Sequence, residues 1–346
     1  MEHISIETPD SRSEILVGEG WESVAGMLPE KGVVIITDDN VRKIYGDSFP
    51  SFPVISVQPG EESKQLSVIE KLGKDLLGTG MDRDGFVLAI GGGVVSDLAG
   101  FLAAIYLRGI RCGFVSTSLL SQVDASTGGK NGVNLGGTKN IIGVIRQPEF
   151  VICDPSMLMT LPEEEYLSGL AEMIKTAIIG DKQLFSMLEG NHRAVLQRDK
   201  DLLTDLIAMS VRFKADVVTR DEREAGLRRI LNFGHTFGHA IEMKTQVRHG
   251  FAVAAGMILA ARFSHEKGLL SIGEMERITG ILNKFGLLTE YDIPTGEIGG
   301  LVMHDKKKSG SGIHFIFTSG IGKAHPERIS LSEVIDFYNR YRENKL

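Results

Sequence analysis

Short apolar runs alternate with helical segments in the first half of this chain, and the alternation limits the fold more than any other feature. Runs short and apolar enough to be buried strands are found at residues 33–37, 54–57, 86–90, 114–115 and 151–153. Helical segments separate them, and the segment at 94–107 reads as mostly buried. This order predicts a parallel, doubly wound α/β sheet whose ligands bind beyond the carboxyl ends of the strands.

The second half of the chain has a different character. After Pro162, helices are expected at residues 166–179, 201–219, 228–243, 251–266, 274–285 and 331–341. Only residues 314–317 read as extended. We therefore expect two domains, an α/β domain at 1–161 and a helical domain at 162–346.

Composition and charge exclude several classes of function. The 346 residues carry a formal net charge of −7, which argues against a nucleic-acid partner. The first residues have no signal-peptide pattern, and the longest apolar run, 251–263, is too short for a bilayer and contains Arg262. We expect a cytoplasmic protein with no membrane partner, in which Cys112 and Cys153 are buried free thiols.

Polar residues occupy the helical positions that usually face a core. Arg228, Asn232, His235 and His239 follow one another at steps of four, three and four, which places them on one face of a helix. Glu224 joins that face or lies on a preceding turn. The glycine before each histidine lets another segment come close. The pattern predicts a helix that lines a polar cavity.

A second helical segment, 170–177, adds a carboxylate to this set. Glu172 and Lys175 share one face among apolar neighbours, so they form either a local ion pair or part of a metal site. Glu172 and two histidines would make an open coordination set suited to a catalytic zinc ion. His235 is one histidine of that set, and spacing alone leaves His239 and His249 as alternatives for the other.

Two glycine-rich stretches in the first half suit phosphate groups. The sequence GGGVVSD at 91–97 joins a strand to a helix, although Ser96 stands where the dinucleotide pattern has glycine. The stretch 118–140 reads as a long functional loop. It carries Asp124, Lys130, Lys139 and Asn140, and the two lysines and the amide suit phosphate or pyrophosphate.

Taken in order, the motifs GGGVVSDLAGFLAA, LLSQVD, GGKN, TKNIIG, SGLAEMIK, NFGHTFGHAIE, RHGFAVAAGM and DKK resemble the 3-dehydroquinate synthase family over nearly the whole chain. The resemblance implies a Rossmann-like, NAD-binding domain at 1–161 and an all-α, metal- and substrate-binding domain at 162–346. It also implies that a zinc or cobalt ion is bound by Glu172, His235 and His249.

The same resemblance implies roles for many other residues. Those expected to contact NAD are Asp38, Asn40, Glu61, Lys64, Gly92, Gly93, Val94, Val95, Ser96, Asp97, Thr117, Ser118, Lys130, Lys139, Met157, Leu158, Met159 and Thr160. Those expected to contact substrate are Arg108, Asp124, Lys130, Asn140, Lys175, Lys214, Arg228, Asn232, His239 and one of Lys306 and Lys307. Among the residues with catalytic roles, Lys175 and His239 would handle protons, with Asn232, Glu224 and Asp124 beside them.

The activity implied is a lyase reaction of the shikimate pathway, which leads to chorismate and the aromatic amino acids. 3-Deoxy-D-arabino-heptulosonate 7-phosphate would give 3-dehydroquinate and phosphate, and NAD would be oxidant and then reductant within one turnover. The family resemblance also implies a homodimer in which Arg108 reaches the phosphate site of the neighbouring subunit. Another sugar-phosphate cyclase and a metal-dependent polyol dehydrogenase of similar fold are the alternatives.

The chain departs from the family pattern at four positions. Ser96 replaces a glycine, Ser118 replaces the second threonine of a pair, and Pro59 stands where an aspartate is common. Phe251 replaces a glutamate two residues after His249, so it alters the surroundings of the metal site while every expected ligand is retained.

Overall fold

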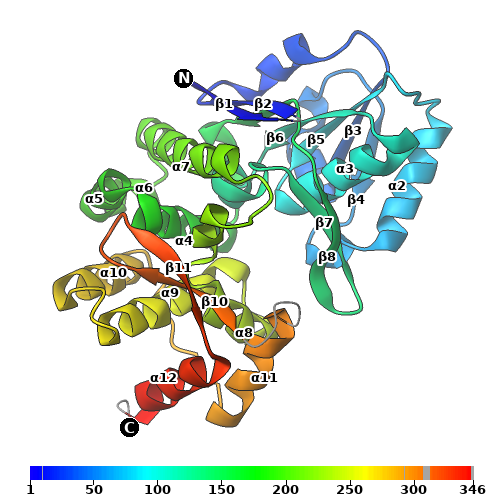
Figure 1. Ribbon diagram of the computed structural model, residues 1–346. Coiled ribbons are helices and arrows are strands. Elements are labelled where there is room, and N and C mark those ends of the chain that lie inside the picture. The colour runs from blue at the N-terminus through cyan, green and yellow to red at the C-terminus, as the bar shows by residue number, and fades with distance from the viewer. Residues whose placement is uncertain (10, 292, 307–311, 344–346) are drawn as a thin grey trace. The chain divides into compact units, whose positions relative to one another are not determined.

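The structure is a computed structural model that describes residues 1–9, 11–291, 293–306 and 312–343, with the backbone alone at 303–306 (Figure 1). The chain divides into two compact units. Unit 1 contains Met1–Pro162 and Arg198–Glu222, and unit 2 contains Glu163–Gln197 and the chain from Arg223 onward. The sequence also predicts a division after residue 161, but it assigns 198–222 to the second domain, whereas this segment lies in unit 1.

A mostly parallel sheet forms the centre of unit 1. Among the described residues its order is β1-β2-β9-β6-β5-β3-β4. The strands are β1 (Glu2–Thr8), β2 (Ser11–Val17), β3 (Val33–Asp38), β4 (Val54–Val57), β5 (Phe86–Gly91), β6 (Arg111–Ser116) and β9 (Phe150–Cys153). The five predicted strands are all present and parallel. β1 and β2 pair antiparallel and are not predicted, because they contain no continuous apolar run; the alternation of polar and buried apolar residues along them is the strand signal that they do carry.

The strand order places a topological switch point between β3 and β5. The chain runs from β3 outward to β4, then returns to β5 on the other side of β3. Ligands of doubly wound sheets bind at such a point, beyond the carboxyl ends of the strands. Asp38 ends β3, and Gly92 follows β5 directly. The helices of unit 1 are α1 (Asp39–Tyr45), α2 (Leu66–Gly78), α3 (Gly93–Ile105) and α7 (Lys200–Arg220).

The expected long loop at 118–140 is instead a short helical turn followed by a β-hairpin. A π-helical turn, η5 (Ser121–Ala125), leads to β7 (Lys130–Leu135) and β8 (Thr138–Ile145), which lie beside α2 and α3 (Figure 1). Glycines and amides hide the strand signal in the sequence. The first strand is nevertheless anchored, because the buried Asn131 side-chain amide donates to the carbonyl oxygens of Gly129 (2.8 Å) and Arg146 (2.9 Å).

Unit 2 is mainly helical. Its helices are α4 (Glu163–Gly180), α5 (Lys182–Gly190), α6 (His192–Leu196), α8 (His235–Thr245), α9 (His249–Glu266), α10 (Ile272–Lys284), α11 (Thr295–Lys306) and α12 (Leu331–Glu343). The all-α expectation is incomplete, because β10 (Ile313–Thr318) pairs with β11 (Ala324–Ile329) in a hairpin. Aromatic rings from the helices and the hairpin form much of the core, and Phe263 and Phe337 stack with centroids 4.3 Å apart.

The continuous helix predicted at 228–243 is wrong. Residues Leu227–Asn232 form a 3-10 helix, η7, and α8 begins at His235. Gly234 separates them with φ at +81°, in the left-handed region, so the helical ladder cannot run through it. The four polar residues therefore lie on two short elements, and a spacing of four, three and four does not reveal the break.

Two other expectations concern the membrane and the cysteines. Within the described part of the chain, none of the helices combines the length and the apolar character needed to cross a bilayer. Cys112 and Cys153 are buried and free, as predicted. Burial raises the pKa of Cys112 to about 12, so this thiol is inert at neutral pH.

Candidate functional site

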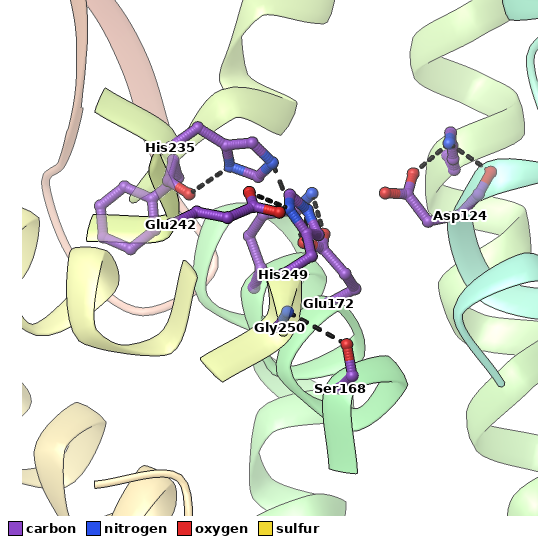
Figure 2. A network of polar contacts seen from close by, with 10 residues as sticks. Asp124, Ser168, Glu172, His235, Glu242, His249 and Gly250 are labelled. Carbon is purple, nitrogen blue, oxygen red and sulfur yellow. Dashed lines mark hydrogen bonds and ion pairs between the residues drawn. The ribbon is translucent and has the colours of Figure 1, made fainter. Parts of the chain in front are cut away.

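Three predicted metal ligands come together in unit 2. Glu172 lies on α4, while His235 and His249 are the first residues of α8 and α9 (Figure 2). One ligand atom from each lies within 4.8 Å of the other two. A second group of the same kind contains His239, Glu242 and His249, so His249 belongs to both.

Glycines bring the three ligand-bearing helices close to one another. A Cβ atom on Gly256 of α9 would lie 2.7 Å from the backbone nitrogen of Gly238 on α8. A Cβ atom on Gly250 would lie 2.5 Å from Cα of Ser168 on α4, and the Gly250 amide donates to Ser168 Oγ at 3.0 Å. Glu172 is one helical turn beyond Ser168, so this contact sets its distance from His249. Gly238 thus has the close-packing role that the sequence indicates.

The cluster contains a fully buried charge. Glu172 has no exposed surface and forms an ion pair with the buried Lys175. Burial raises the pKa of Glu172, but Lys175 and the two histidines outweigh it and hold the pKa well below its usual value. Burial, with Lys175, lowers the pKa of His235 to about 3. Burial also lowers the pKa of His249, but Glu172 and Glu242 raise it to about 9.

These residues fit a divalent metal ion. One carboxylate and two imidazoles form an open donor set typical of catalytic zinc sites. Although ion-paired, the Glu172 oxygens have no well-aligned hydrogen-bond donor among the described residues, so they keep lone pairs for a ligand. His235 Nε2 and His249 Nε2 lie 3.8 and 3.3 Å from Glu172 Oε1. The donor atoms of all three residues therefore converge.

Other predicted residues of unit 2 lie on η7, on the turn before it and on α8. Arg228 is 2% exposed, which is rare for an arginine side chain. Glu224 lies on the turn before η7, with φ at +58°, and its carboxylate accepts a hydrogen bond from Asn232 Nδ2 at 2.5 Å. His239 lies one turn after His235, with ring centroids 5.1 Å apart. Lys306 ends α11, and Lys307 lies outside the described residues.

In unit 1, a buried lysine joins predicted residues from three elements. Lys64 Nζ donates to Asp97 Oδ2 on α3 and to Asn140 Oδ1 on β8, each at 2.6 Å. Glu61 Oε1 lies 3.8 Å from Lys64 Nζ and accepts from Asn134 Nδ2 at 2.9 Å. Burial raises the pKa of Asp97 to about 6, although Lys64 opposes the shift. The arrangement gathers polar groups beside the amino end of α3.

A second lysine of unit 1 also holds a predicted residue. Lys214 on α7 is 7% exposed, and its ammonium donates to the Asp124 carbonyl oxygen at 2.6 Å and to the Asp124 carboxylate. Asp124 lies in the π-helical turn, a local form that is often found at functional sites.

Other predicted NAD contacts lie at the carboxyl edge of the sheet. The Asp38 carboxylate accepts from the backbone nitrogens of Asn40 (2.9 Å) and Val41 (3.0 Å), and burial raises its pKa. Gly92 caps α3, and the following residues Gly93, Val94, Val95 and Ser96 form its first turn. Thr117 donates its backbone N–H to Gly91 at 3.0 Å, and Ser118 follows it.

The other predicted residues of unit 1 lie on further elements. Arg108, Lys130 and Lys139 are exposed, and Arg108 has φ at +70°. Met157, Leu158, Met159 and Thr160 lie in a 3-10 helix, in which Met157 and Leu158 are buried and the other two are exposed. A cavity of about 280 Å³ beside β4 is lined by Asp39, Ser56, Val57, Gln58, Ser63, Val68, Lys71 and Leu72, none of which sequence reasoning selected.

One polar residue in each unit contacts the predicted ones and is not itself predicted. Glu242 contacts His249, and Asn134 bonds Glu61 and the Asn140 backbone N–H. Glu242 lies three residues after His239 and could have been found as a further carboxylate on the same helix face. Asn134 carries no comparable signal, because its role depends on the hairpin.

Comparisons with known proteins identify the family of the chain. Residues 54–168 match a family model described as 3-dehydroquinate synthase N-terminal, and residues 169–308 match 3-dehydroquinate synthase C-terminal. The chain is 45% identical to 3-dehydroquinate synthase from Acidithiobacillus ferrooxidans, over 87% of this chain and 86% of that protein. It is 41% identical to 3-dehydroquinate synthase from Geobacter metallireducens, over 97% and 98% of the two chains.

A solved structure is similar over the same length. It is the crystal structure of 2-deoxy-scyllo-inosose synthase complexed with carbaglucose-6-phosphate, NAD+ and Co2+. It has 26% sequence identity and a TM-score of 0.86, and the match covers 97% of this chain and 98% of the other. The sequence relatives and the two family models support one conclusion: this chain belongs to the 3-dehydroquinate synthase family.

Proposed function

We propose that this protein converts 3-deoxy-D-arabino-heptulosonate 7-phosphate into 3-dehydroquinate and phosphate, a lyase step of the shikimate pathway. Its cofactors would be NAD and a divalent metal ion, zinc or cobalt. The observation that carries the proposal is the converging group of Glu172, His235 and His249, in a chain with family relatives over almost its whole length.

The cofactors define what the protein's own residues must do. Bound NAD would accept a hydride from one substrate carbon and later return it, and the metal ion would lower the cost of forming an alkoxide from a substrate hydroxyl. Glu172, His235 and His249 would hold the metal. Polar groups at the switch point of the sheet, including Asp97 and Lys64, would hold NAD.

Proton handling falls to residues beside the metal ligands. Lys175 is one helical turn from Glu172, and His239 is one turn from His235. We assign to them the transfer of protons at the substrate hydroxyls. The hydrogen bond between Asn232 and Glu224 would orient the Asn232 amide toward the substrate.

Cationic and amide groups would bind the two anionic ends of the substrate. We assign Arg228 and Lys214 to the carboxylate, because arginine binds carboxylates in a bidentate manner. Lys214 would then share its ammonium between the substrate and Asp124. Lys130, Asn140 and one of Lys306 and Lys307 would neutralise the phosphate. We further propose a cytoplasmic homodimer in which Arg108 reaches the phosphate site of the partner subunit.

One incubation separates this activity from its alternatives. The protein is mixed with the heptulosonate phosphate, NAD and zinc, while phosphate release and NADH absorbance are recorded together. We expect phosphate release without NADH accumulation, because the hydride returns within each turnover. Net NADH formation without phosphate would instead indicate a polyol dehydrogenase. Phosphate release from another sugar phosphate alone would indicate a different cyclase. Glu172→Ala should abolish phosphate release.

A further inference from the structure

The ring of His249 lies between two carboxylates. Its Nε2 is 3.3 Å from Glu172 Oε1, and its Nδ1 is 3.1 Å from Glu242 Oε2 (Figure 2). Both possible metal-binding groups found among the described residues of unit 2 include His249, one with Glu172 and one with Glu242. The two ring nitrogens point in different directions. If Nδ1–H donates a hydrogen bond to Glu242, Nε2 is left to bind a metal together with Glu172.

His235 shows the same orientation with a different acceptor. Its Nδ1 is 3.2 Å from the carbonyl oxygen of Phe233, and its Nε2 faces Glu172 Oε1 at 3.8 Å. A carbonyl oxygen can only accept, so this contact places the proton of neutral His235 on Nδ1. Both histidines thus turn Nε2 toward Glu172 and hold Nδ1 against an acceptor.

Burial distinguishes the two carboxylates further. The side chain of Glu172 is 1% exposed and that of Glu242 is 12% exposed. Glu172 lies in the middle of α4, which packs against α9, whereas Glu242 lies near the end of α8. Gln246, with φ at +58°, ends α8 and reverses the chain, so that His249 returns to Glu242 across seven residues. A local turn therefore builds the contact.

We propose that Glu242 is a positioning residue for the metal centre and not a metal ligand. Its carboxylate accepts the Nδ1–H hydrogen bond of His249, which fixes the tautomer and the ring orientation and leaves the Nε2 lone pair for the metal. A carboxylate partner also makes the imidazole a stronger donor. The inference rests on the proposed function only in assigning the metal to Glu172, His235 and His249.

The test measures metal binding, which does not require turnover. The zinc dissociation constants of purified Glu242→Gln and Glu242→Ala are determined by competition with a chelating dye. Loss of such a partner weakens metal affinity about 10- to 100-fold. We expect Glu242→Ala to lie in that range and Glu242→Gln to lose less, because the glutamine oxygen still accepts a hydrogen bond. His249→Ala should lose binding far beyond that range.

Two spectroscopic measurements separate positioning from ligation. The absorption spectrum of cobalt-loaded Glu242→Gln should indicate the same coordination number as the spectrum of the cobalt-loaded parent protein. Nitrogen NMR of the zinc-loaded protein should show a proton on His249 Nδ1. A changed coordination number, or an Nδ1 without a proton, would overturn the proposal and favour the group containing His239.

Glu297→Gln is the matched control. Glu297 on α11 pairs with Lys244 of α8 at 2.5 Å, so the substitution removes a carboxylate contact of the same helix without touching His249. We expect its zinc affinity to match that of the parent protein. Equal weakening in Glu297→Gln and Glu242→Ala would mean that α8 responds as a whole, which would overturn the specific role. A cooperative denaturant-unfolding transition of each metal-free variant shows that the variant is folded. If the parent protein binds zinc as expected but does not turn over the substrate, the proposed function is wrong and the role of Glu242 is unaffected.

Discussion

Glycines serve different physical purposes in the β7–β8 hairpin and at the metal-binding helices. Gly136 and Gly137 connect β7 to β8 with φ of +58° and +79°, and nothing lies within 4 Å of a Cβ placed on either. At Gly238, Gly250 and Gly256, by contrast, φ is not left-handed and a Cβ would meet the backbone of a neighbouring helix. Gly136 and Gly137 allow a left-handed backbone conformation, whereas Gly238, Gly250 and Gly256 allow neighbouring helices to approach each other closely.

The difference shows what kind of substitution each region tolerates. A turn that needs positive φ accepts residues that adopt the left-handed region, chiefly asparagine and aspartate. A helix contact that leaves no room for a methyl group accepts nothing larger than glycine unless the helices separate. Because the metal ligands lie on those helices, separation would also move the donor atoms.

Gly250→Ala is expected to have the largest effect. The new methyl group would collide with the backbone at Ser168, which should destabilise the protein by about 3 kcal/mol, the upper end for overpacking. Zinc affinity should fall as well, because α4 and α9 carry Glu172 and His249. Denaturant unfolding and zinc competition measure the two effects.

Gly280→Ala is the control for this change. Gly280 lies inside α10, and nothing lies within 4 Å of an added Cβ. Replacing glycine by alanine in a helix interior should stabilise the protein by about 0.5–1 kcal/mol and leave zinc affinity unchanged. If Gly250→Ala changes stability and zinc affinity no more than Gly280→Ala does, Gly250 is not needed for the close approach of α4 and α9.

The two units also differ in how they hold a buried carboxylate beside a lysine. Burial raises the pKa of Asp97 in unit 1 to about 6, and Lys64 reverses only part of the shift. At Glu172 in unit 2, burial also raises the pKa. Lys175 and the two histidines together outweigh burial, so the pKa lies well below 4.5. One paired cation is too little to offset burial, whereas three groups suffice.

This difference predicts opposite dependences of stability on pH. The folded state raises the pKa of Asp97 from 3.8 to about 6, so its contribution is fully present below pH 3.8 and is lost as the pH rises through 6. A pKa raised from 3.8 to about 6 corresponds to a loss of about 3 kcal/mol. Glu172 stabilises metal-free protein above its unfolded pKa of 4.5, and that contribution is lost as the pH falls through the lowered folded pKa.

Carboxyl NMR and unfolding between pH 4 and 7 test this prediction. The parent protein should show an aspartate that titrates near 6, and Asp97→Asn should remove both that titration and the associated change in unfolding free energy. Retention of the same pH dependence in Asp97→Asn would assign it to another group.

Sequence reasoning succeeds where one periodicity extends along an element. The strands β3 and β5 are buried on both faces, so their apolar runs are visible without a structure. It fails at Gly234, because a 3-10 helix, a break and an α-helix preserve the spacing of Arg228, Asn232 and His235 while changing their directions. It also fails at β7, where asparagine and glycine replace the usual strand formers.

The candidate site follows the same rule. Glu172 and His235 stand out because polar residues are unexpected on buried helix positions. Glu242 does not, because its contact with His249 exists only after the chain reverses between α8 and α9. Lys214 and Asp124 are 90 positions apart in the sequence, so the residues around each of them do not predict that they pair.

Gly136→Asn should have the smallest effect and a favourable one. Leu135 pairs with Thr138, so Gly136 and Gly137 form a two-residue turn with positive φ at both positions, in which asparagine followed by glycine is strongly preferred. Asparagine lowers the entropy of the unfolded chain without strain, which should stabilise the protein by about 0.4–1 kcal/mol. Gly136→Ala should lose about 1 kcal/mol, because alanine is strained there. Denaturant unfolding and hydrogen exchange of the hairpin amides measure both variants. Equal losses for asparagine and alanine would show that space, and not conformation, limits this turn, and the contrast with Gly250 would disappear.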